Sequence, residues 1–181
     1  MKVPDFDRLE KNIIDVVKEE QIKLGYQKEV IRLYYPLSSL NNYLKTNLDI
    51  AGMNKTLKEF CGREKDIFGS IEISHEKERV CFCLSDEVSV YVNEHTQNEG
   101  FLYDLIEEIS RHPAQMDNVI ALFHKYSEQV HVERAGHGEF DYLIYFADGQ
   151  PDEYMYCLTD EGNGHIIYHR YTREDYDDLN L

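Results

Sequence analysis

Four apolar or aromatic runs, separated by short polar segments, occur in residues 130–171, VHVERAGHGEFDYLIYFADGQPDEYMYCLTDEGNGHIIYHRY. The separating segments carry glycine, asparagine and aspartate, which are residues that favour tight turns. The pattern therefore predicts an antiparallel β-meander with strands at 130–134, 140–147, 154–159 and 165–171.

The N-terminal third of the chain has a helical pattern instead. Apolar residues between Phe6 and Leu24 recur three or four positions apart, and Gly25 is placed to end this helix. The same analysis predicts a short strand at 30–35, ended by proline, and amphipathic helices at 37–44 and 50–60.

The central part of the chain combines both patterns. Alternating apolar residues predict three strands, at 71–73, 80–84 and 88–92. Two amphipathic helices are expected at 101–109 and 116–123, and the short connection between them favours an antiparallel helix hairpin.

These elements form segregated runs rather than βαβ alternation, which favours the α+β class. We expect a single α+β domain over residues 1–181, because no linker rich in serine, glycine or proline interrupts the chain. Its parts are N-terminal helices, antiparallel sheet strands, a central helix hairpin and the C-terminal β-meander.

Charge is distributed unevenly along the chain. The helix-rich residues 1–66 carry 12 Lys/Arg and 11 Asp/Glu, whereas residues 67–181 carry 7 and 24, giving a net charge of −16 overall. An acidic surface repels phosphate backbones and anionic membranes. We therefore expect no nucleic-acid and no membrane partner, and the favoured partner is a basic protein.

The cysteines and the N-terminus bear on the compartment. The four cysteines have no framework spacing, which predicts reduced thiols and a cytoplasmic protein. The first twenty residues are rich in acid and lack the apolar segment of a signal peptide. No apolar run approaches the roughly 20 residues that a membrane span requires.

No complete catalytic or cofactor signature is present. The chain lacks Gly-x-x-x-x-Gly-Lys, Gly-x-Gly-x-x-Gly and Gly-x-Ser-x-Gly, so the sequence assigns no cofactor and no catalytic residue. Enzyme activity stays open at this point.

Histidines of the meander are candidate metal ligands. On strands, His165 and His169 share a face, as do His131 and Glu133, so pairing the first and last strands would assemble a metal site. The alternative is that the histidines are ordinary surface residues. A metal-dependent enzyme or metal sensor would draw its ligands from His131, His137, His165 and His169, with Glu133 or Asp141.

Tyrosines on the same predicted sheet are candidate binding residues, because tyrosine combines a large ring with a polar tip and is enriched at interfaces. In the other interpretation, half of the rings line the core and the rest brace neighbouring strands. A binding module, such as an inhibitor or immunity-type protein, would dock a basic protein through Tyr142, Tyr145, Tyr154, Tyr156, Tyr168 and Tyr171.

Two N-terminal segments carry a family resemblance. Residues 9–15, LEKNIID, through residues 33–40, LYYPLSSL, resemble the opening of an uncharacterised domain family from gut Firmicutes, a domain of unknown function. The resemblance runs along most of the chain. It implies a bacterial cytoplasmic protein and supplies no activity, ligand or catalytic residue.

Overall fold

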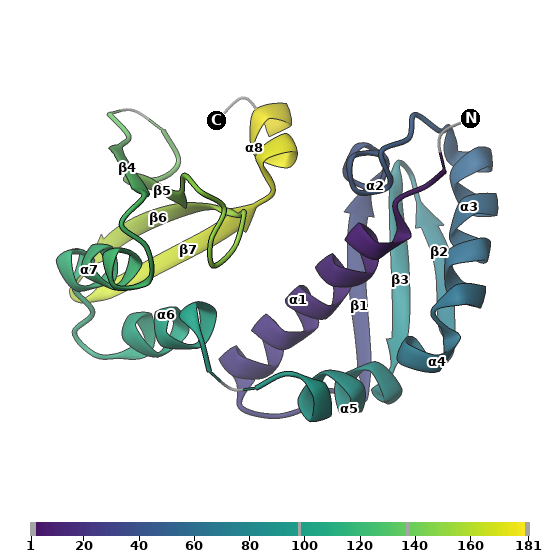
Figure 1. Cartoon of the computed structure of the whole chain (residues 1–181), viewed down its shortest axis with the longest axis horizontal. Helices are drawn as coiled ribbons and strands as arrows, with labels where there is room; N and C mark the ends of the chain where they lie inside the picture. The colour runs from purple at the N-terminus through teal and green to yellow at the C-terminus, as the bar shows by residue number, and fades with distance from the viewer. Residues whose placement is uncertain (1–2, 98, 137, 180–181) are drawn as a thin grey trace. The chain divides into compact units, whose positions relative to one another are not determined.

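The computed structural model describes residues 3–97, 99–136 and 138–179. Within it the chain divides into two compact units, Met1–Asn98 and Glu99–Leu181. Each unit has its own antiparallel sheet and its own helices, so the predicted α+β class is confirmed (Figure 1). The expectation of one domain over the whole chain stays a prediction.

The first unit contains a three-stranded sheet of order β1-β3-β2. Its strands are β1 (Val30–Pro36), β2 (Ile71–Glu76) and β3 (Arg79–Ser85). Its helices are α1 (Phe6–Leu24), α2 (Leu37–Leu44), α3 (Ile50–Arg63), α4 (Lys65–Phe68) and α5 (Asp86–His95). Because β1 pairs with β3 along its whole length, residues beyond the compositional change at position 66 fold together with the N-terminal helices.

The core of this unit is built largely from side chains of β3 and α1. Strand β3 contributes every second residue to one buried cluster, and helix α1 contributes residues four positions apart. The members from these two elements include Val80, Phe82, Leu84, Leu9, Ile13 and Val17. The N-terminus of α1 is capped by Asp5, which accepts a hydrogen bond from the Arg8 backbone N–H, and Gly25 ends the helix at φ +72°.

The strand predicted at 88–92 is wrong, since these residues belong to helix α5. Val88 and Val92 are buried on one side of the helix, while Val90 is 41% exposed on another. Asp86 and Glu87 occupy the first turn, where the helix dipole favours negative charge. Three valines spaced by two residues therefore fit a helix when only the first and third are buried.

The second unit contains the predicted meander, with strands in the order β4-β5-β6-β7. The strands are β4 (Val130–Arg134), β5 (Tyr142–Phe146), β6 (Met155–Gly162) and β7 (His165–Tyr171). Helices α6 (Phe101–Ser110) and α7 (Met116–Tyr126) form the predicted hairpin, and α8 (Arg173–Leu179) follows β7. None of the described helices is long and apolar enough to cross a membrane.

Helices lie against both faces of this second sheet. Phe101 of α6 and Phe123 of α7 contact Phe146 and Tyr156 on one face. On the other face, Tyr176 of α8 packs with Phe140, Tyr145 and Tyr171 over a small cluster formed by Leu143, Met155 and Cys157. Residues of β5 and β6 are therefore buried on both sides, as their nearly continuous apolar sequence requires.

Candidate functional site

The six candidate tyrosines divide into two groups. Tyr156 is completely buried and Tyr168 is 8% exposed, and the Tyr156 ring contacts Phe101 and Phe123. These two rings belong to the core and are not accessible to a partner. The other four are half-buried: Tyr142, Tyr145, Tyr154 and Tyr171.

Arginines of the meander and of α8 lie over three of the half-buried rings. The guanidinium carbon lies 4.4 Å from the ring centre in the Arg170–Tyr154 pair and 5.0 Å in the Arg173–Tyr145 pair. Arg134 lies 5.9 Å from the ring centre of Tyr142. These cation–π contacts hold the rings in place, and they put three positive charges of the second unit over tyrosine rings.

Strand register places Tyr145 and Tyr171 on the face that α8 partly covers. Tyr145 is opposite His131, Tyr171 is opposite Met155, and His169 is opposite Cys157. The His131 and Tyr145 rings stack with their centres 4.7 Å apart. We call this surface the α8 face and define it by its solvent-accessible members, which are His131, Glu133, Tyr145, Ile167, His169 and Tyr171.

The predicted metal ligands lie apart on the sheet. Strands β4 and β7 are its two edges, and at about 4.8 Å per strand His131 is about 14 Å from β7. His165 and His169 are four residues apart on one strand, a separation of about 13 Å. His137 lies outside the described residues, and Asp141 accepts a hydrogen bond from the Asp160 backbone N–H at 2.8 Å.

Glu133 stays next to His131, with 3.5 Å between its Oε2 atom and His131 Nε2. Among the described residues, no group of three or more His, Cys, Asp or Glu side chains is placed to hold a metal ion. The sheet thus leaves His131, His165 and His169 in separate surroundings.

His165 does have a histidine neighbour, but it comes from outside the meander. The rings of His112 and His165 are 4.3 Å apart between centres and nearly perpendicular, at 88°. His112 follows α6, so no spacing pattern in the sequence links it to β7. Only the packing of the loop after α6 against the β6–β7 hairpin brings the two together.

Comparison with known proteins identifies the family. A family model described as a domain of unknown function, E. rectale gene description (DUF3877), matches residues 6–180. The chain belongs to the DUF3877 family. This confirms the resemblance to an uncharacterised domain family of gut Firmicutes. No curated protein and no solved structure matches the chain.

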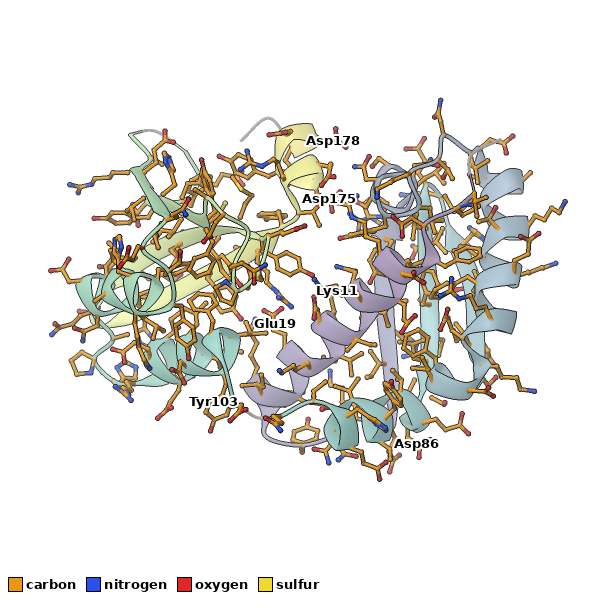
Figure 2. All side chains as sticks on the ribbon, viewed as in Figure 1. Lys11, Glu19, Asp86, Tyr103, Asp175 and Asp178 are labelled. Atoms are coloured by element: carbon orange, nitrogen blue, oxygen red, sulfur yellow. The ribbon has the colours of Figure 1, made fainter. Side chains whose placement is uncertain are left out.

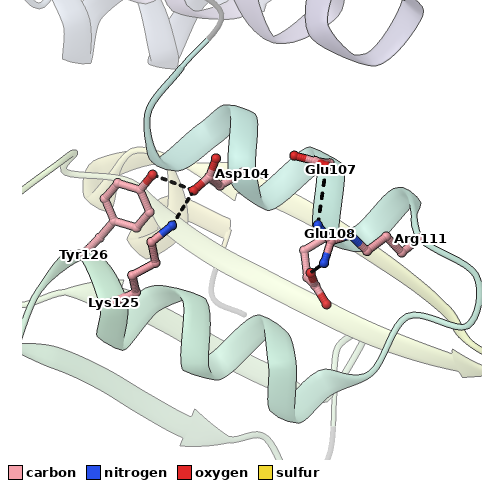
Figure 3. Close-up of polar contacts among 6 residues, drawn as sticks. All are labelled: Asp104, Glu107, Glu108, Arg111, Lys125 and Tyr126. Carbon is pink, nitrogen blue, oxygen red and sulfur yellow. Dashed lines mark hydrogen bonds and ion pairs between the residues drawn. The ribbon is translucent and has the colours of Figure 1, made fainter.

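In this DUF3877 chain, a polar cluster joins the start of α6 to the end of α7 (Figure 3). Asp104 accepts hydrogen bonds from Lys125 Nζ at 2.9 Å and from Tyr126 Oη at 2.7 Å. The Lys125 bond, followed by the Tyr126 bond, lowers the pKa of Asp104. Burial and the Asp104 carboxylate together raise the pKa of Tyr126 to about 12. The cluster fixes the antiparallel helix hairpin.

We expect Asp104→Asn to lower the free energy of unfolding at pH 7 by about 1 kcal/mol, because the amide oxygen still accepts but no longer carries the negative charge that strengthens both hydrogen bonds at this partly exposed site. The Asp104 pKa is lowered by folding, so its contribution is present above the unfolded-state pKa and disappears as the pH falls through the folded-state pKa. The contribution of the Tyr126 bond disappears at the alkaline end, as the pH rises through about 12.

Urea unfolding of the wild type and Asp104→Asn across a pH series measures this difference. Glu128→Gln removes one exposed carboxylate outside the cluster and serves as the matched control. Equal stability of Asp104→Asn and the wild type at pH 7, or a difference that is unchanged in acid, would contradict the role given to the cluster.

Proposed function

We propose that this chain is a bacterial cytoplasmic protein that binds a basic protein partner through its second unit. The observation that carries the proposal is the charge of residues 99–181, which contain 18 Asp/Glu and 5 Lys/Arg, a net charge of −13. The first 98 residues carry only −3 of the total of −16. Attraction of a basic partner is therefore concentrated in one unit.

The positive groups of the second unit do not offset this charge. Arg111 contacts Glu107 and Glu108, and Lys125 contacts Asp104 (Figure 3). The remaining three are arginines that lie over tyrosine rings. Even if every base were paired with an acid, 13 carboxylates would remain in excess, so internal pairing leaves a strongly negative surface.

The α8 face is the part of this unit best suited to docking. It presents half-buried Tyr171 together with Ile167, which is 41% exposed, beside Tyr145, whose ring already contacts His131 and Arg173. Helix α8 adds acids in a short stretch, and Figure 2 labels Asp175 and Asp178 on it. Tyrosine rings accept the aliphatic stems of lysine and arginine while carboxylates bind their charged ends. A Lys/Arg-rich protein segment is the occupant that this combination favours.

The proposal predicts salt-dependent capture of a basic protein. Full-length protein on a resin should retain a basic partner from native bacterial lysate at 0.1 M salt and release it towards 1 M, because the Debye length falls from about 10 Å to about 3 Å. The retained protein is identified by mass spectrometry, purified, and titrated against the immobilised chain. Retention of no basic protein at low salt would refute the proposal.

A pair of charge-matched variants then locates the binding surface. Glu174→Gln/Asp177→Asn/Asp178→Asn removes three carboxylates from α8, and Glu59→Gln/Asp66→Asn/Glu72→Gln removes three exposed ones from the first unit. We expect the α8 variant to lower the association rate constant of the purified partner about tenfold and the control to leave it unchanged. Equal effects in the two variants would remove the α8 face from the proposal.

A further inference from the structure

The histidine pair formed by His112 and His165 lies outside the docking surface proposed above. Both side chains are exposed, and their rings contact each other with centres 4.3 Å apart. Within the described part of the chain, neither imidazole has a hydrogen bond to a protein group. The ring nitrogens are thus available to a ligand from solution.

The backbone around the pair is held firmly. The Ala114 N–H donates to the Gly164 carbonyl oxygen at 3.0 Å, which joins the residues beside the two histidines. Gly164 has φ +79°, and a Cβ at this position would lie 2.4 Å from Pro113 Cβ. The two loops approach as closely as glycine permits, so the two imidazoles are brought together before any ligand arrives.

The electrostatic surroundings favour a cation. Arg111, directly before His112, contacts Glu107 at 3.4 Å and Glu108 at 2.7 Å, so its charge is exceeded by that of its partners. Asp160 and Glu161 are exposed on the strand that leads to His165. These five charged side chains together contribute a net charge of −3 to this end of the unit.

We propose that His112 and His165 form a two-imidazole binding site for a borderline divalent transition-metal cation. Imidazole nitrogen suits Cu²⁺, Ni²⁺ and Zn²⁺, and the Irving–Williams order places Cu²⁺ as the tightest of the three. Two protein nitrogens occupy two coordination positions and water occupies the others. The site is open to solvent, and its ligands are independent of the tyrosines and acids of the α8 face.

Isothermal calorimetry of untagged full-length protein titrated with Cu²⁺ tests the site. Excess Mg²⁺ occupies surface carboxylates, because Mg²⁺ prefers oxygen ligands and leaves imidazole to Cu²⁺. We expect one Cu²⁺ per chain, and His112→Asn or His165→Asn should each weaken binding about 100-fold, since a second tethered ligand raises affinity by about 10² or more. The double variant measures background binding at the N-terminus and elsewhere.

His169→Asn is the matched control, because His169 is an exposed histidine of the same strand that does not contact His112. Electron paramagnetic resonance gives a second readout, in which nitrogen couplings should fall from two imidazoles to one in either single variant. The three single variants carry substitutions at exposed positions and should keep the near-UV circular dichroism spectrum of the wild type. Equal weakening in His169→Asn, or wild-type affinity in His112→Asn and His165→Asn, would overturn the proposal.

Discussion

Phe101→Ala is expected to lower the free energy of unfolding by about 3–5 kcal/mol, the range for removing a large aromatic side chain from a packed core. Phe101 is 3% exposed and lies at the first residue of α6. Its ring contacts four other rings. The centre distances are 4.7 Å to Phe123, 5.4 Å to Tyr126, 4.8 Å to Phe146 and 5.6 Å to Tyr156. Truncation would leave a cavity between the helix hairpin and the sheet.

Denaturant unfolding followed by near-UV circular dichroism measures this loss, since nine of the 14 tyrosines lie in residues 99–181. Ile167→Ala is the control, because Ile167 is 41% exposed and its truncation should cost less than about 1 kcal/mol. If Phe101→Ala cost no more than Ile167→Ala, the aromatic cluster would not be the core of this unit. Phe101→Leu keeps much of the volume and should recover part of the stability.

The sequence predicted most elements because their burial follows simple periods. The meander is an example at β7, whose residues alternate between buried and exposed, and at the β6–β7 turn, where Asn163 and Gly164 both have positive φ. Periodicity failed at Val88, Val90 and Val92, where spacing by two residues fits a strand and a helix with one exposed valine equally well. The ten-residue length of α5 and the two acids of its first turn are typical of a helix.

The candidate site was less accessible to sequence reasoning, because it depends on which face each helix covers. Tyr156 and Tyr168 look like Tyr145 and Tyr171 in the sequence, yet Tyr156 packs against Phe101 of α6 and Phe123 of α7, and Tyr168 is buried beside Tyr156. The His112–His165 contact depends on the packing of two loops distant in sequence. Neither relation follows from local spacing, since both are set by tertiary packing.

Gly164→Ala should destabilise the second unit by about 2–5 kcal/mol, more than a glycine substitution at an open turn. At φ +79° any Cβ costs about 1–2 kcal/mol. In addition, the new Cβ would lie 2.6 Å from Pro113 Cα, a backbone atom that moves only if the loop moves, and overpacking of this kind costs about 1–3 kcal/mol.

Gly162→Ala isolates the contribution of close packing, because Gly162 has the same φ of +79° and a Cβ added there would meet no other atom within 4 Å. The two variants therefore share the backbone strain and differ in the clash with Pro113. In denaturant unfolding, Gly164→Ala should be less stable than Gly162→Ala by about 1–3 kcal/mol. The clash would also separate His112 from His165, so Gly164→Ala should weaken Cu²⁺ binding while Gly162→Ala retains it. Equal stabilities would show that the loop after α6 yields freely, and the preorganised histidine pair would then lose its structural basis.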